Sequence, residues 1–319
     1  MPTPPDRRPG PGPAAAQAAA GLPGPAPGIA FAGIGDEAGS GLHDQLSALD
    51  RLGWRCLELR TVAGQAVADL DDRAFAGLAA ELDARGVAVC CLDSRIGNWA
   101  RPVTADFDAD LRELEVLAAR CAALGTNAIR IMTYPNDGLA EPEWRRRAVE
   151  RVRRLCAVAE SRGVVLLAEN CAGWAAERAE RMLDLLDAAG PALGLLFDTG
   201  NGVAHGYGPP ALLSDIADRV AHVHVKDALP ATGGGEPAYT APGEGRAGVA
   251  ACLRMLVERG YRGVWSIEPH LSLHPHRGSA AGTGDADGFV AAGEALRRLA
   301  AEAVAAAAGT QATGAGAPG

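Results

Sequence analysis

The sequence predicts a single (β/α)8 barrel of the TIM type. Eight short apolar runs alternate with eight longer amphipathic stretches. This alternation requires a parallel sheet, because each helix returns the chain to the end of the sheet where the next strand begins. A doubly wound open sheet remains the alternative on periodicity alone. The residues that close the strands favour the barrel, since a barrel gathers its functional residues at the carboxyl ends of its strands.

The strands are expected where short runs rich in β-branched and aliphatic residues occur. In chain order they are Ile29 to Asp36, Cys56 to Arg60, Val87 to Ser94, Ala128 to Tyr134, Val164 to Asn170, Leu193 to Asn201, Val220 to Asp227 and Gly263 to His270. The amphipathic stretches between and after them are expected as helices. They are Leu42 to Leu52, Asp71 to Arg85, Asp106 to Leu124, Glu141 to Arg162, Ala175 to Ala189, Pro209 to Asp218, Gly248 to Arg259 and Asp285 to about Ala305.

The barrel is expected to span residues 29–305, with disordered tails at 1–28 and 306–319. The first of these segments is mainly Pro, Ala and Gly, and Arg7 and Arg8 are followed by Pro9 with no leucine-rich stretch. This composition is typical of a disordered tail and not of a secretion signal. Residues 228–248 are rich in Gly and Pro, which suggests a mobile lid over the barrel mouth or simple linker slack.

Charge and cysteine usage limit the possible partners and location. The net charge of −9 argues against a nucleic-acid partner, and no apolar run approaches the length of a membrane span. Seven cysteines, an odd number without CxxC spacing, fit reduced thiols in a cytoplasmic protein. We therefore expect a cytoplasmic protein that acts on a small molecule, with a homo-oligomer as one possible assembly.

Four consecutive predicted strands end in residues of the kinds that bind metals. Each follows an apolar run, where an ionised side chain is costly to bury without a cation or another partner. Three carboxylates and one imidazole form an oxygen-rich site that suits Mn2+ first, with Mg2+ or Co2+ as alternatives, better than a structural zinc. A helix cap or a salt bridge explains any single member, but not four on adjacent strands. The four are Glu169, Asp198, His224 and Glu268.

The only lysine among the 30 Lys and Arg residues lies in the run His222-Val223-His224-Val225-Lys226-Asp227. Alternation along a strand places His222, His224 and Lys226 on one face. Lys226 is expected to hold a substrate oxygen or stabilise an enolate; a buried ion pair with a barrel carboxylate is the alternative.

Other polar or aromatic side chains near the strand ends are candidates for substrate contact. Glu58, Arg60 and Arg130 can instead pair across the barrel. His222 lies one inward step deeper than His224, which favours a role in the core or behind the ligands. Trp99 can wall a pocket or make a plain hydrophobic loop contact. The full set of candidates is Glu58, Arg60, Trp99, Arg130, Asn201, His222 and His270.

Five short motifs in this order resemble those of the xylose-isomerase-like TIM barrels. They are Ala168-Glu169-Asn170, Phe197-Asp198-Thr199-Gly200-Asn201, the run from His222 to Asp227, Pro242-Gly243-Glu244-Gly245 and Ser266-Ile267-Glu268-Pro269. The resemblance implies one divalent metal held by Glu169, Asp198, His224 and Glu268. Two positions depart from the pattern: Cys171 follows Asn170 where relatives often carry a nearby histidine, and Asn201 stands where a histidine is common.

The chemistry expected of such a site is proton removal next to a carbonyl. A metal with open positions chelates a carbonyl oxygen and its neighbouring hydroxyl and stabilises the enolate. Glu169 and Glu268 are then expected to remove and return the proton, giving epimerisation or isomerisation of a sugar or a sugar-like ketone. Loss of a β-hydroxyl gives dehydration of the inosose or 3-dehydroshikimate type instead. The acidic net charge argues against a DNA-repair endonuclease. A non-catalytic partner subunit that keeps the metal as a structural clamp remains an alternative.

Overall fold

The computed structural model describes residues 24–232, 236–271 and 284–314. The predicted N-terminal tail therefore lies almost wholly outside the described residues, as do residues 315–319 of the predicted C-terminal tail and residues 233–235 of the predicted lid. Within the described part, no helix is both long and apolar enough to cross a membrane.

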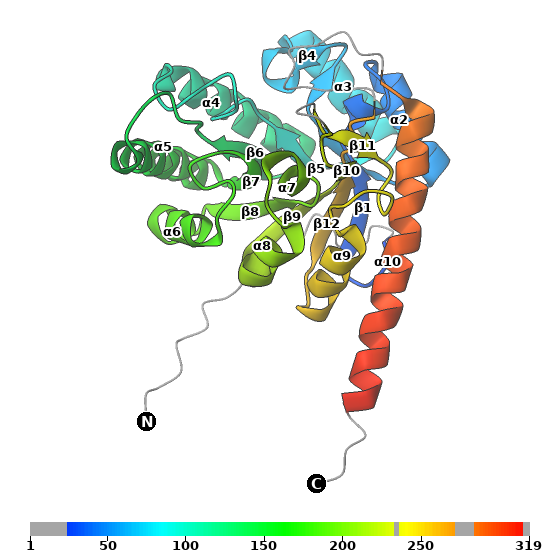
Figure 1. Cartoon of the computed structure of the whole chain (residues 1–319). Helices are drawn as coiled ribbons and strands as arrows, with labels where there is room; N and C mark the ends of the chain where they lie inside the picture. The colour runs from blue at the N-terminus through cyan, green and yellow to red at the C-terminus, as the bar shows by residue number, and fades with distance from the viewer. Residues whose placement is uncertain (1–23, 233–235, 272–283, 315–319) are drawn as a thin grey trace, which may run out of the picture.

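Eight parallel strands form one sheet that curves into a nearly closed barrel (Figure 1). The two strands at the ends of the sheet, β1 and β2, meet through a single bridge between Ile34 and Glu58. The barrel predicted from the sequence is thus confirmed. In sheet order the strands are β1 (Ile29–Gly33), β12 (Gly263–Ile267), β9 (Val220–Val225), β8 (Leu193–Asp198), β7 (Val165–Gly173), β6 (Ala128–Thr133), β5 (Ala88–Asp93) and β2 (Cys56–Leu59).

The helices surround this sheet, as the barrel requires (Figure 1). Asp71 and Asp106 accept backbone hydrogen bonds at the starts of two of them, and Gly53, Gly125 and Gly163 end three of them in the left-handed conformation. The helices are α2 (Leu42–Leu52), α3 (Asp72–Ala84), α4 (Phe107–Leu124), α5 (Glu141–Arg162), α6 (Ala179–Ala189), α7 (Asn201–His205), α8 (Pro209–Ile216), α9 (Val249–Glu258) and α10 (Ala286–Gly314).

Two features of the helices differ from the expectation. The short helix α7 begins at Asn201, inside the segment expected to be the sixth strand. Helix α10 continues past Ala305 to Gly314, well into the segment expected to be a disordered tail. The four consecutive alanines from Ala305 to Ala308 favour the first part of this extension, because alanine has the highest helix propensity.

Several strands end earlier than expected at the mouth of the barrel. Asp36 lies in a 3-10 turn (Gly35–Glu37), and His270 lies beyond β12 with a φ of 52°. The backbone leaves the sheet at these points, so the side chains turn across the mouth instead of alternating.

The described part of residues 228–248 contains a short hairpin. Its strands are β10 (Asp227–Leu229) and β11 (Ala238–Thr240), which pair in antiparallel fashion. The buried carboxylate of Asp227 accepts backbone hydrogen bonds from Gly243, Gly245 and Ala247. The segment is therefore tied to the end of β9, the strand that carries His224 and Lys226.

Candidate metal centre

Four of the predicted site residues meet at the carboxyl ends of four neighbouring strands. Glu169 is on β7, Asp198 ends β8, His224 is on β9, and Glu268 directly follows β12. One ligand atom from each lies within 4.8 Å of the others, and all four residues are buried. The strand register accounts for the meeting, because Asp198 and Ser266 are both paired with His224 in adjacent strands.

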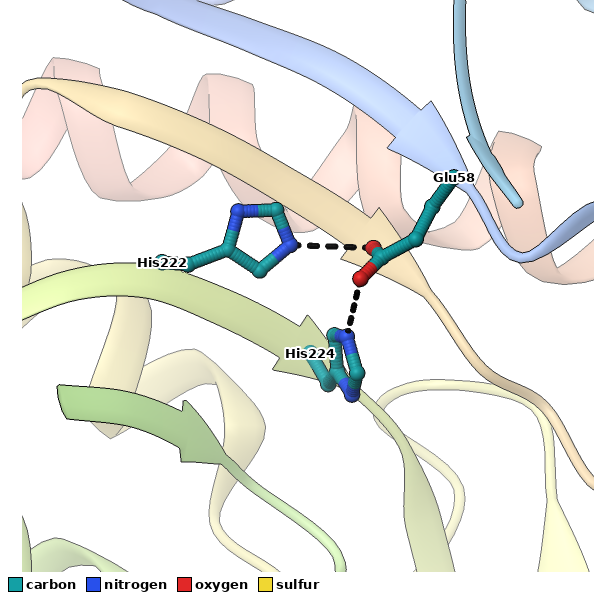
Figure 2. A group of neighbouring side chains, drawn as sticks. All are labelled: Glu58, His222 and His224. Atoms are coloured by element: carbon teal, nitrogen blue, oxygen red, sulfur yellow. Dashed lines mark hydrogen bonds and ion pairs between the residues drawn. The ribbon is translucent and has the colours of Figure 1, made fainter. Parts of the chain in front are cut away.

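Glu58 determines which nitrogen of His224 faces the other three residues. Figure 2 shows the imidazole rings of His222 and His224, both from β9, turned toward the carboxylate of Glu58 on β2. Each ring has its Nε2 2.9 Å from a Glu58 oxygen. A carboxylate only accepts, so Nε2 of His224 donates and Nδ1 is left to face Glu268 Oε2 at 3.5 Å and Glu169 Oε1 at 4.0 Å.

Asp198 is fixed by the backbone that follows it. Its Oδ1 accepts hydrogen bonds from the amides of Gly200 at 2.8 Å and Asn201 at 2.7 Å. Its Oδ2 lies 3.1 Å from Lys226 Nζ but has no well-formed hydrogen bond, and His224 Nδ1 has none either. Two buried ligand atoms without hydrogen bonds, within one cluster of four, fit a divalent cation better than an unaided polar core.

The two glutamates have different neighbours. Glu169 accepts a hydrogen bond from the side-chain amide of Asn201 at 2.9 Å and lies 3.3 Å from the Arg130 guanidinium. Glu268 instead accepts from Arg60 at 2.8 Å on Oε1 and from Lys226 at 2.8 Å on Oε2. Glu268 is therefore paired with two cations, whereas Glu169 is held by one neutral amide and a longer ion pair.

Arg60 links this centre to acidic residues from the first strand–helix connection. It forms ion pairs with Asp36 at 2.8 Å and with Glu37 at 2.6 Å as well as with Glu268. Glu37 also accepts hydrogen bonds from the backbone amide and the Nδ1 of His270, each within 3.0 Å. Sequence reasoning missed Asp36 and Glu37 as part of the site, although they follow an apolar strand just as Glu169 and Asp198 do.

Asp93 is a third missed residue. It ends β5, its side chain is fully buried, and its Oδ2 lies 3.0 Å from Arg130. Arg130 therefore bridges Asp93 and Glu169. The position of Asp93 at the end of an apolar strand is the signal in the sequence that could have identified it.

Burial and charge shift the pKa values of these groups in opposite directions. Burial raises the pKa of Asp93 to about 7, against the nearby Arg130 charge. Burial likewise raises the pKa of Asp198 to about 6 against the charge of Lys226. Burial also acts to raise the pKa of Glu268, but the charges of Lys226 and His270 outweigh it and hold this pKa well below its usual value.

A cavity of about 270 Å³ opens beside the cluster. Lys226, Glu169 and Glu268 line it, so the charged groups are accessible to a small molecule. Five of the seven predicted substrate contacts lie on its wall: Arg60, Trp99, Arg130, Asn201 and His270. Glu58 and His222 are not part of this wall. They lie behind His224, where Glu58 pairs across the barrel with both histidines of β9.

The chain is similar to known proteins over most of its length. Residues 46–286 match the family model described as xylose isomerase-like TIM barrel. The chain is 30% identical over 241 residues to the rhizopine catabolism protein MocC of Rhizobium meliloti, covering 67% of this chain and 73% of that protein. It is 36% identical over 90 residues to inosose dehydratase of Geobacillus kaustophilus, which is 28% of this chain and 29% of the dehydratase.

Solved structures show the same fold at lower identity. An L-ribulose 3-epimerase superposes with a TM-score of 0.67 at 16% identity, covering 88% of this chain and 97% of the epimerase. The protein IolI, solved with a bound zinc atom, has a TM-score of 0.67 at 17% identity, covering 87% of this chain and 98% of IolI. On the extent of the family match, this chain belongs to the xylose isomerase-like TIM barrel family.

Proposed function

We propose that this protein is a divalent-metal-dependent isomerase or epimerase of a small sugar or cyclitol ketone. The observation that carries the proposal is a pair of buried carboxylates, Glu169 and Glu268, that line one cavity beside the four-residue cluster. Glu169 lies on β7 and Glu268 directly follows β12, and these two strands are separated in the sheet by β8 and β9. Two carboxylates that border one cavity from different strands can remove a proton and return it at another position of the same small molecule.

The metal is proposed to be held by Glu169, Asp198, His224 and Glu268. When bound, a divalent cation such as Mn2+, Mg2+ or Co2+ supplies the positive charge that an enolate oxygen requires. The protein's own residues orient the side chains that would hold the metal. Glu58 orients His224, while the backbone amides of Gly200 and Asn201 orient Asp198.

The different neighbours of the two glutamates suggest different roles in proton transfer. Arg60 and Lys226 stabilise the ionised form of Glu268. A well-stabilised carboxylate is a weaker base, so we assign the first proton removal to Glu169. Glu268 is ionised before the reaction and must first take up a proton before it can return one at the second position. Arg130 and Lys226 line the cavity as positive charges for the developing oxyanion.

The size of the cavity fits a single sugar or cyclitol ring. Its wall combines the charged groups with the side chains of Trp99, Met132 and Tyr239. Such a wall packs against the C–H face of a ring while polar groups bind its hydroxyls.

Dehydration is the second candidate reaction. The similarity to inosose dehydratase over 90 residues favours it, and it needs the same first step. The two reactions separate after that step, according to whether the second acid protonates carbon or a leaving β-hydroxyl.

Solvent exchange tests the proposal. The protein is incubated with Mn2+ in deuterated water and offered a panel of ketoses and inososes. Deuterium at the carbon next to the carbonyl, lost in Glu169→Gln, supports proton abstraction; a product lighter by one water identifies the dehydratase. Failure of the wild-type protein to label or convert any member of the panel, with Mn2+ shown to be bound, would leave the non-catalytic partner subunit as the better description.

A further inference from the structure

Lys226 contacts the oxygens that the proposed metal ligands have left available. Its Nζ lies 2.8 Å from Glu268 Oε2 and 3.1 Å from Asp198 Oδ2. The other oxygen of each carboxylate is already used. Asp198 Oδ1 accepts from the backbone amides of Gly200 and Asn201, and Glu268 Oε1 accepts from Arg60.

A divalent cation bound by this cluster would need the same two oxygens. An ammonium carries a full charge in a compact group and donates all its protons, so it cannot share both oxygens with a second cation without strong repulsion. Burial increases this repulsion, because little water screens it, and Lys226 and Asp198 are both buried.

The first carbons of the Lys226 side chain are closely packed, and the residue also borders the cavity. A Cβ at Gly200 would lie 2.6 Å from Cγ of Lys226, so the backbone at Gly200 packs directly against the first carbons of the stem. Lys226 is also one of the residues that line the cavity. Lysine suits this arrangement because its point charge sits on a flexible stem, whereas arginine presents a rigid planar fork.

We propose that Lys226 is the resident counter-cation of the metal-free centre and releases Asp198 and Glu268 when a divalent cation binds. This inference rests on the proposed metal site. In the metal-free protein the ammonium compensates two buried carboxylates, which would otherwise be costly to bury. After metal binding the freed ammonium is available to the substrate in the cavity. Metal binding therefore also makes Lys226 available for substrate contact.

Metal affinity in three lysine variants tests the competition. Calorimetric titration with Mn2+ and Mg2+ is compared for the wild type, Lys226→Met, Lys226→Gln and Lys226→Arg, with circular dichroism to check the fold. Removing the competing charge should tighten metal binding by about tenfold or more in the Met and Gln variants. The Arg variant keeps a cation in place and should show no such gain.

The single lysine provides a second measurement on the wild-type protein. Reductive methylation with formaldehyde and cyanoborohydride modifies only amines, so the peptide that contains Lys226 reports its release, with the terminal amine as an internal reference. Saturating Mg2+ should accelerate methylation of Lys226 relative to that reference. Because this measurement uses the wild-type protein, it tests the inference even if a variant does not fold.

The outcomes separate the two claims. Unchanged or weaker metal binding in the folded Met and Gln variants, or slower methylation of Lys226 with Mg2+, overturns the lysine inference while the metal site survives. Absence of Mn2+ and Mg2+ binding in the wild type and in all three variants overturns the metal site itself.

Discussion

Glu58 and His224, 166 residues apart in the chain, are joined by a 2.9 Å hydrogen bond behind the proposed metal position. The bond fixes the ring so that Nε2 is used and Nδ1 faces the cluster. Burial raises the pKa of Glu58, but the charges of His224 and His222 outweigh it and hold the pKa well below its usual value, so the acceptor remains ionised. The ligand geometry of His224 thus depends on a residue outside the cluster.

Glu58→Gln should weaken Mn2+ binding by roughly 10- to 100-fold, the size typical of losing such a supporting partner. Glutamine has one acceptor oxygen, one donor NH2 group and no charge, so it cannot accept from both imidazoles and no longer fixes the tautomer of His224 by charge and acceptance together. His222→Gln is the matched control, because it leaves the bond between Glu58 and His224 in place and should bind Mn2+ nearly as the wild type does. Equal losses in both variants would show that the pair acts only on stability.

Lys226→Met should lower kcat/KM by roughly ten- to a thousandfold, because it deletes a positioned positive charge beside the cavity. Lys226→Arg should not restore full activity, since its planar fork cannot place the charge at the same point. Steady-state kinetics at saturating metal measure this effect. Near-wild-type kinetics in the Met variant would show that the single lysine does not contribute to the reaction.

The raised pKa of Asp93 predicts that the metal-free protein becomes less stable as the pH rises. Its pKa is raised from 3.8 to about 7 by burial, so the folded protein holds this proton more tightly than the unfolded chain does. The free energy of unfolding therefore falls between about pH 4 and pH 7 on account of this group. Asp93→Asn should gain stability relative to the wild type across that window, as measured by urea unfolding in EDTA. A relative loss instead would mean that the Arg130 ion pair outweighs burial.

The order of strands and the four clustered residues could be predicted because both follow from local patterns. Apolar runs mark the strands, and the parallel barrel brings the residue that closes each run to the same end. Asn201 and His270 were assigned to strands because their neighbours in sequence are strand-like. The structure places them beyond the sheet, where turn geometry decides their direction.

The partners of the buried charges could not be predicted. Glu58, Arg60 and Arg130 were each expected either to bind substrate or to pair across the barrel, and the alternation of a strand does not decide between these. Arg60 reaches Glu268 across a sequence separation of 208 residues, and Glu58 reaches both histidines of β9. Such pairings depend on the curvature of the closed sheet.

The central claim is that one divalent cation is bound by Glu169, Asp198, His224 and Glu268, and titration of the Asp198→Ala variant with Mn2+ tests it most directly. Asp198 closes β8 at the mouth of the barrel and is not one of the residues of the hydrophobic core. Calorimetry and elemental analysis should find one Mn2+ per wild-type chain and none in the variant, with circular dichroism unchanged. Full Mn2+ occupancy in a folded Asp198→Ala protein would contradict the account.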